Sequence, residues 1–387
     1  MPGPACLEQK PVVFAQEARH LRRRGTSLCL WTTYSLFHLS GSAAGRWATR
    51  VSAAGESGGT SAPTVPPGWL GAEMAALKSA YGSNHLSHGL LIHEAPGAGG
   101  NWLAKWIASL VMCQNPAAAP CGRCPGCHRV ATAQHPDLLV LQPEEESTQI
   151  KIEQIRGLSE ELALTAHQGA YKVGVITPAD TLNRFAANAL LKTLEEPPAR
   201  TLLMLVVTQP SRLPATILSR CQRVRIRAPG RQEAVSWLQA TRGPANWEAV
   251  LDTLGDAPML AVDVDPKAVL DVGQEVRRTL DDAVVGGGDP VTTADRWSRN
   301  ELPLRLRCIE NWLTDQIRAH SGYDGFLTKV GAATHSPRVK PVLNMGYLFE
   351  LMDGVRELKS ALDAPINKGL ALEAVLRRFA PGRGARG

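Results

Sequence analysis

The chain has 387 residues, of which 44% are hydrophobic and 20% are charged, and its formal net charge is +6. This length and composition are those of a soluble globular protein with two or three domains. Because the chain contains no run of about 18 or more apolar residues, a membrane span is not expected. The net charge would suit a nucleic-acid partner, but the positive excess is unevenly distributed.

Residues 1–64 are predicted to be a disordered N-terminal extension, because they are rich in Ser, Gly, Ala and Arg and show no sustained helical or strand period. They hold seven basic residues against three acidic ones, so they supply +4 of the net charge and leave the remainder nearly neutral at +2. Two other interpretations stay open. Three arginines at 22–24 before an apolar run, with few acidic residues, would suit a targeting segment, and a wrongly assigned start codon would also account for the extension.

From residue 65 onward, short apolar runs alternate with amphipathic segments. The apolar runs predict buried strands at 88–93, 137–142, 171–177 and 201–208. The amphipathic segments predict helices at 101–112, 155–164 and 184–196. Such alternation is typical of a mostly parallel sheet covered by helices. A last strand is predicted near residue 224. After Pro229 no further strand is evident, so the remainder is predicted to be all-helical, and the fold class is α/β plus all-α.

The first predicted strand leads into a glycine-rich loop, HEAPGAGGN, which opens the first predicted helix. Its spacing matches a phosphate-binding loop, G-x-x-x-x-G-K-[ST], up to the last two positions. Gly97 and Gly99 keep the turn, but Gly100 replaces the lysine and Asn101 replaces the hydroxyl that would hold magnesium. Glu94 stands at the position of the first glycine, where its charge would repel a triphosphate. The alternative is an ordinary glycine-rich turn between a strand and a helix.

A second set of catalytic positions is also missing. In an ATPase of this type, the strand at 171–177 would end in an aspartate that holds magnesium and a glutamate that activates water. Here those positions are Thr177 and Pro178, followed by Ala179 and Asp180. Two independent losses of the same chemistry favour a degenerate ATPase that binds no ATP over a coincidental turn.

Four of the eight cysteines follow the first predicted helix in the pattern C-x7-C-x2-C-x2-C. They are Cys113, Cys121, Cys124 and Cys127. Four thiolates at this spacing suit a closed, structural zinc site, which would brace a small hairpin-like insertion before the second strand. A disulfide pair, free thiols, or His128 or His135 as a substitute ligand are the alternatives. The other four cysteines are scattered, which argues for a reducing compartment.

The segment LPATILSRC precedes the last predicted strand. Arg220, between Ser219 and Cys221, is either an ordinary exposed arginine or an arginine finger that presents its guanidinium to a phosphate bound by a neighbouring subunit. A chain that cannot hydrolyse ATP can still complete a neighbour's site in this way. In the following strand, Val224 and Ile226 are predicted to face one side and the flanking arginines the other.

Together these motifs resemble the delta-prime family of bacterial DNA polymerase III clamp-loader subunits, within the AAA+ superfamily. The resemblance runs from about residue 66 to residue 382 and also includes HPD at 135–137, AANALLKTLEEPP at 186–198 and GLALEAVLRRF near the end. The first cysteine spacing is one residue shorter than is usual in the family, and residues 1–64 match nothing in it.

The resemblance implies a three-domain subunit with a short tail. Its parts would be a RecA-like α/β domain at 65–228 with a zinc module at 113–127, a small helical lid at 229–267, a helical collar at 268–382 and the tail at 383–387. The collar would assemble into a ring of five subunits.

The resemblance also implies a non-catalytic stator in the cytoplasm, which stands beside the ATP-hydrolysing gamma or tau subunits. With delta it would help to load the beta sliding clamp onto primed DNA, as part of a nucleotidyltransferase holoenzyme but without polymerase or ATPase activity of its own. Arg220 would be the finger acting in trans, the four cysteines the zinc ligands, and Thr208 the sensor residue. DNA contacts would be electrostatic and shared around the ring.

Two other functions stay open. One is an ATP-hydrolysing AAA+ motor subunit such as gamma or tau, against which Gly100, Asn101, Thr177 and Pro178 all count. The other is a stand-alone zinc-containing module that would bind nucleic acid tightly and in a salt-dependent manner as a monomer.

Overall fold

The computed structural model describes residues 65–144, 147–167, 171–320, 343–362 and 366–380. The extension at 1–64 and the tail at 383–387, both named from the sequence, lie outside the described residues. No helix in the described part of the chain is both long enough and apolar enough to cross a membrane.

Five parallel strands form one sheet in the order β2-β3-β4-β1-β5. They are β1 (Gly89–His93), β2 (Leu138–Leu141), β3 (Lys172–Ile176), β4 (Thr201–Val207) and β5 (Gln222–Arg225). The first strand lies between β4 and β5, with Leu91 opposite both Leu205 and Arg223. The predicted parallel α/β sheet is thus confirmed, and the last strand has its apolar Val224 buried and its arginines exposed, as predicted.

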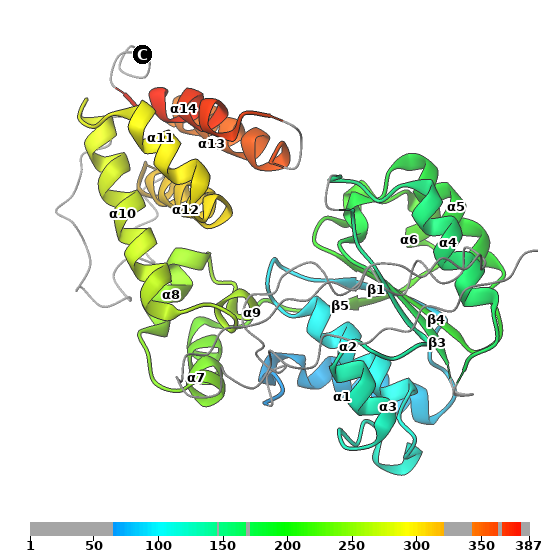
Figure 1. Cartoon of the computed structure of the whole chain (residues 1–387). Helices are drawn as coiled ribbons and strands as arrows, with labels where there is room; N and C mark the ends of the chain where they lie inside the picture. Colours follow the sequence, from blue (N-terminus) through cyan, green and yellow to red (C-terminus); the bar gives the residue numbers. More distant parts are fainter. Residues whose placement is uncertain (1–64, 145–146, 168–170, 321–342, 363–365, 381–387) are drawn as a thin grey trace, which may run out of the picture. The chain divides into compact units, whose positions relative to one another are not determined.

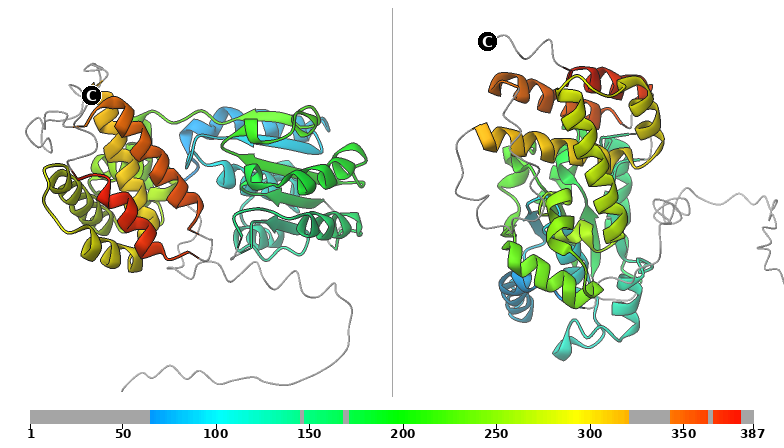
Figure 2. Two further views of the ribbon diagram at one scale, coloured as in Figure 1. Left: turned by 90° about the horizontal axis from the view of Figure 1, so that it is seen from above. Right: turned by 90° about the vertical axis from the view of Figure 1, so that its left-hand side faces the viewer.

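Helices cover both faces of this sheet (Figures 1 and 2). On one face lie α1 (Gly71–Gly82) and α2 (Gly100–Val111), and on the other lie α4 (Ile152–Ala163), α5 (Arg184–Glu195) and α6 (Ala215–Leu218). Because side chains alternate along a strand, Leu90 and Ile92 join the core beneath α2, whereas Leu91 joins the core beneath α4 and α5. A strand buried on both faces is apolar at every position, which accounts for the continuous apolar runs in the sequence.

The remaining chain is helical, since no strand follows Arg225 among the described residues. The helices are α7 (Arg231–Arg242), α8 (Trp247–Leu254), α9 (Pro258–Ala261), α10 (Pro266–Val284), α11 (Pro290–Arg299), α12 (Leu302–His320), α13 (Met345–Ser360) and α14 (Lys368–Arg377). Their starts follow local rules: Asp265, for example, accepts a hydrogen bond from Lys267 N–H, and Pro266 occupies the first turn of α10.

These helices contribute to two separate cores. Helices α7 and α8 bury Trp237, Leu238 and Trp247 in the same core as α2, where Trp69 and Trp237 meet edge to face at 5.2 Å. Helices α10 to α14 enclose the second core, around residues such as Leu351. The apolar residues along one side of α13 are buried there, namely Leu348, Leu351, Met352, Val355 and Leu358. The domain boundaries at 229–267 and 268–382 stay predictions.

Glu275 in α10 is the main ionic centre of this second core. Its carboxylate accepts hydrogen bonds from Trp297 Nε1 at 2.9 Å and from Arg305 Nη1 at 2.7 Å, and it pairs with Arg296 at 2.8 Å. Burial alone would raise the pKa of Glu275, but the hydrogen bonds from Trp297 and Arg305, together with the charges of Arg305 and Arg296, outweigh burial and lower it. The side chain of Arg305 is only 8% exposed, so it depends on this carboxylate as its counter-charge.

Replacing Glu275 by Ala is therefore expected to lower the free energy of unfolding by about 3 kcal/mol, because it leaves a buried guanidinium unpaired. Denaturant unfolding measures this change. Glu357→Ala on the exposed side of α13 is the matched control and should cost less than about 0.5 kcal/mol. Equal losses in the two variants would contradict the assignment.

Candidate functional site

The glycine loop (residues 94–101) connects the carboxyl end of β1 to the first turn of α2. Gly97 and Gly99 have φ angles of 73° and 113°, in the region that favours glycine. The loop therefore has the sharp strand-to-helix turn that its sequence predicts. In this turn the backbone N–H groups at the start of α2 are available for a negatively charged partner.

That partner is a side chain of the loop itself. The Glu94 carboxylate accepts hydrogen bonds through Oε2 from Gly99 N–H at 2.8 Å and from Gly100 N–H at 2.6 Å. The Glu94 residue is 8% exposed. Burial raises the pKa of Glu94, and the hydrogen bonds from the two amides oppose this rise. The sequence predicts only that Glu94 repels phosphate, whereas in the structure its carboxylate occupies the amides that a phosphate would use.

The loop has no space for the side chains of an active phosphate-binding loop. A Cβ atom at Gly100 would lie 2.6 Å from Glu94 Oε1 and 2.7 Å from Val206 Cγ1, so a lysine there would require rearrangement. A Cβ atom at Gly97 would lie 2.6 Å from the Cβ of Ala257. Met259 N–H donates to the Gly97 carbonyl at 3.1 Å, so the segment 257–259 covers the loop.

An indole from a segment N-terminal to the loop also holds it. Trp69, in a short 3-10 helix (Gly68–Leu70), donates from Nε1 to the carbonyl oxygen of Ala98 at 2.7 Å. Trp69 is only 1% exposed. The loop is thus held by Trp69, which precedes it in the chain, and by Met259, which lies far beyond it.

The two sets of degenerate positions lie together and are bonded to each other. Thr177 Oγ1 donates to Asn101 Oδ1 at 2.6 Å, so the residues that replace both magnesium ligands form one pair. Thr208, predicted as the sensor residue, donates from its hydroxyl to Asp180 Oδ2 at 2.8 Å. Pro178 precedes a 3-10 helix (Ala179–Thr181), which positions Asp180 for this bond. These polar side chains are therefore directed at one another.

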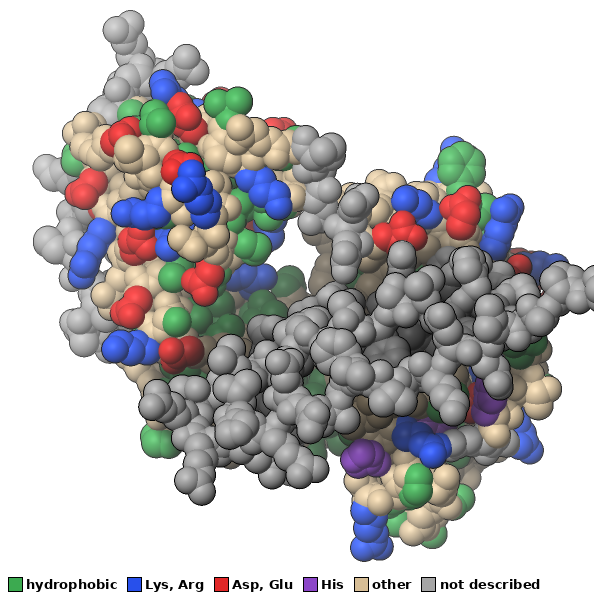
Figure 3. Space-filling model, viewed as in Figure 1, with side chains coloured by type: hydrophobic (Ala, Val, Ile, Leu, Met, Phe, Trp, Pro, Cys, Tyr) green, Lys and Arg blue, Asp and Glu red, His purple; other side chains and the backbone are tan. Residues whose placement is uncertain are grey.

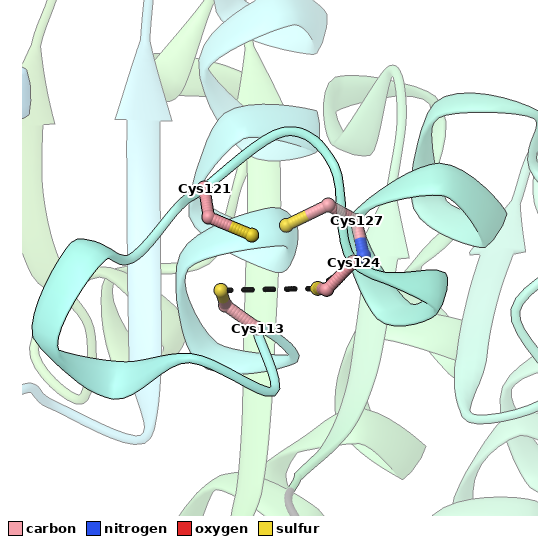
Figure 4. A group of neighbouring side chains, drawn as sticks. All are labelled: Cys113, Cys121, Cys124 and Cys127. Atoms are coloured by element: carbon pink, nitrogen blue, oxygen red, sulfur yellow. Dashed lines mark hydrogen bonds between the residues drawn. The ribbon is translucent and has the colours of Figure 1, made fainter.

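The four predicted cysteines form one cluster, in which all Sγ atoms lie within 4.8 Å of one another (Figure 4). The cluster comprises Cys113, Cys121, Cys124 and Cys127. Cys113 follows the end of α2, and its sulfur lies 3.9 Å from that of Cys124. Four sulfurs at this separation fit the four ligand positions around one tetrahedral metal ion.

The thiols of the cluster differ in acidity. Burial raises the pKa of Cys124, but hydrogen bonds from the amides of Cys127 and Gln114 lower it to about 6, which favours the thiolate at neutral pH. Burial raises the pKa of Cys127 to about 12, so without a metal ion this thiol keeps its proton. All six cysteines in the described part of the chain are free, so no disulfide pair is present there. His135 instead accepts a hydrogen bond at Nδ1 from Asp137 N–H at 3.2 Å.

The insert that carries these cysteines is helical, and the prediction of a hairpin-like insertion is wrong. It consists of a 3-10 helix (Pro116–Ala118) and α3 (Pro125–Ala131), with no strand between Cys113 and Cys127. The Cys124 sulfur accepts from Cys127 N–H at 3.4 Å, and Pro125 occupies the first helical position. The proline therefore starts a helix rather than a turn between strands.

Arg220 lies just after α6, and its guanidinium is held within the chain. Nη2 pairs with Glu195 Oε1 at 2.6 Å, and Nη1 donates to the Thr216 carbonyl at 2.9 Å. The Arg220 side chain is 35% exposed. The guanidinium is thus accessible to a neighbour and has a defined orientation. Its partner Glu195 lies near the end of the AANALLKTLEEPP motif.

The comparisons with known proteins agree on one family. A family profile described as "DNA polymerase III, delta subunit" matches residues 71–230. The chain is 34% identical over 246 residues to DNA polymerase III subunit delta' of Pseudomonas aeruginosa, a match that covers 62% of this chain and 74% of that protein. It is 33% identical over 265 residues to the delta' subunit of Escherichia coli, covering 66% and 77%. The chain belongs to the DNA polymerase III delta-prime family.

This delta-prime family member also resembles a second kind of DNA polymerase III subunit. It is 33% identical over 156 residues to subunit tau of Salmonella typhimurium, a match that covers 40% of this chain and 24% of that protein.

Several contacts of the glycine loop and of Arg220 are not predicted by the sequence. Glu195 and Asp180 lie within or beside recognisable motifs, but only the fold pairs Glu195 with Arg220 and Asp180 with Thr208. The sequence does contain a signal for the Glu94 contact. A glutamate opens the loop, and glycine stands where an active loop has its lysine. No local pattern indicates the covering residue Met259.

Proposed function

We propose that this chain is the non-catalytic delta-prime stator of a DNA polymerase III clamp loader in the cytoplasm. In this role it assists the ATP-dependent loading of the beta sliding clamp onto primed DNA. The observation that carries the proposal is the closed glycine loop: Glu94 holds the amides that would bind phosphate, and Thr177 pairs with Asn101 where a metal ion would be held. Such a subunit assists hydrolysis elsewhere.

The proposed partners are gamma or tau and delta, joined in a hetero-pentamer through the helices α10 to α14 as a collar. Membership of the delta-prime family and likeness to a tau subunit support this kind of partner. The beta clamp and the primer-template DNA would be reached through the assembled complex. On the face drawn in Figure 3, positive and negative side chains are interspersed over the C-terminal helices, which suits protein partners more than a nucleic-acid ligand acting alone.

Arg220 is proposed as the arginine finger toward ATP on the adjacent subunit, with Ser219 and Cys221 flanking it. Its accessibility and its held guanidinium support this role. A preorganised guanidinium stabilises the charge that develops on a transferred phosphoryl group. The four-cysteine cluster is proposed to hold one structural zinc ion, since four thiolate ligands leave no open position for catalysis.

Isothermal titration calorimetry on the isolated chain is expected to detect no uptake of Mg-ATP, and the same protein is expected to show no ATP turnover. The physical reason is that the loop provides neither a cation nor free amides for phosphate. A gamma or tau subunit purified in the same way is the positive control. Turnover by this chain alone would identify a motor subunit instead, and tight, salt-sensitive DNA binding by the monomer would favour a stand-alone nucleic-acid module.

A further inference from the structure

We propose that Glu94 is the resident ligand of the glycine loop, and that its carboxylate takes the position that an oxyanion of a bound phosphate would hold. The inference rests on the proposed function. It attributes the proposed inability to bind nucleotide both to the missing lysine and to a loop that is already occupied. Glu94 is a positioning residue in this role.

The contacts are those expected of an anion at the start of a helix. The Oε2 atom of Glu94 receives two backbone N–H groups at 2.8 and 2.6 Å, within the range of hydrogen bonds to a charged acceptor. Helix α2 has 12 residues, so its dipole favours negative charge at this end. Among the described residues, the hydrogen bonds of this carboxylate come from backbone amides, and no lysine or arginine forms an ion pair with it.

Burial shows that the loop is built around this side chain. Glu94 is 8% exposed, and a buried carboxylate would be strongly unfavourable without partners, so the two amides are needed to retain it. The space at Gly100 is taken by Glu94 Oε1 and by Val206, which leaves room for glycine alone. Glycine at position 100 is therefore compatible with the glutamate beside it, and a larger residue there would have to displace both Glu94 and Val206.

The test is rescue of a truncated variant by inorganic phosphate. Glu94→Ala removes the carboxylate and leaves the amides of Gly99 and Gly100 free. Its Tm is expected to fall by several degrees in chloride buffer, and inorganic phosphate at about 50 mM is expected to raise that Tm by about 2 °C or more. The wild-type Tm should move by less than about 1 °C under the same change, because its loop is already filled.

Glu153→Ala is the matched control. Glu153 is exposed in the first turn of α4, which also has 12 residues, and it lines no closed loop. Phosphate should stabilise this variant no more than the wild type. Equal stabilisation of wild type and Glu94→Ala would overturn the inference, as would no stabilisation of the Ala variant.

A second measurement keeps the proposal testable if Glu94→Ala does not fold. In wild-type protein, the amide protons of Gly99 and Gly100 are expected to exchange with solvent at least about tenfold more slowly than in Glu94→Gln, which keeps the shape but loses the charge. Exchange as fast as that of exposed loop amides would overturn the inference. Uptake of Mg-ATP by the wild type would refute the proposed function as well, whereas failed phosphate rescue without such uptake refutes the role of Glu94 alone.

Discussion

Replacing Arg220 by Ala is expected to slow ATP hydrolysis at the site that borders this subunit by on the order of a thousandfold, while the complex still assembles. An arginine finger contributes most of its effect in the transition state, when negative charge increases on the transferred phosphoryl group. In a complex reconstituted with gamma or tau and delta, the total ATPase rate should fall by the fraction that this one site contributes to it. Single-turnover hydrolysis on the reconstituted complex measures it.

The same substitution should leave the fold of this subunit almost unchanged. The pair between Arg220 and Glu195 is partly exposed, with side chains that are 35% and 49% accessible, so losing it should cost no more than about 1 kcal/mol of stability. Arg223→Ala, on the exposed side of β5, removes the same charge nearby and serves as the control. Arg220→Lys should stay impaired, because lysine lacks the planar fork of the guanidinium. An unchanged rate in Arg220→Ala would remove the finger assignment.

Replacing Cys113 by Ser is expected to reduce the metal content from about one zinc per chain to nearly none. Serine has the shape of cysteine but is a poor zinc ligand, and structural zinc in small domains binds with about 10–16 kcal/mol of apparent free energy. The insert at 113–131 should then become more sensitive to proteolysis, because the metal would join Cys113, just after α2, to the three other cysteines of the insert. Val130 of α3 stays buried in the core with α2, and Lys105 Nζ still donates to the Ala131 carbonyl at 2.6 Å. Metal analysis and limited proteolysis measure the two effects.

Cys308→Ser provides the control for this experiment. Cys308 is buried in the second core, outside the four-cysteine cluster, so its variant should keep the metal even if its stability is reduced. Freshly reduced wild-type protein without zinc would refute the proposed site. Zinc retained at the wild-type level in Cys113→Ser would show that other ligands carry the metal.

Most of the fold was predictable because burial on both faces of a parallel sheet leaves a strong pattern. The run at 171–177 predicts a strand that the structure places at Lys172–Ile176, and the helix expected at 184–196 is Arg184–Glu195. The hairpin-like insert is the wrong prediction, because proline and glycine mark both turns and helix starts. The structure shows a helix start there, at which the Cys124 sulfur accepts from the Cys127 amide.

The candidate site was predicted residue by residue, but not as a set of contacts. Thr177 and Asn101 were each recognised as losses, and yet their mutual hydrogen bond joins positions 76 residues apart. The covering of Gly97 by Ala257 depends on how α9 packs against the α/β core, which no local period encodes. Sequence motifs therefore predict which phosphate-binding and metal-binding groups are absent, and the fold shows which contacts the residues at those positions make.

The strand β5 has a consequence for how this protein can associate. It is the last strand of the sheet and, among the residues that the structure describes, pairs with β1 alone, so one row of its backbone groups has no partner strand there. Such an open edge can recruit a strand from another molecule and begin aggregation, but β5 has only four residues and exposes Arg223 and Arg225. Short, charged edges of this kind resist strand addition. Self-templated growth of the sheet is thereby disfavoured at this edge, and contacts of β5 with another chain are left to its side chains.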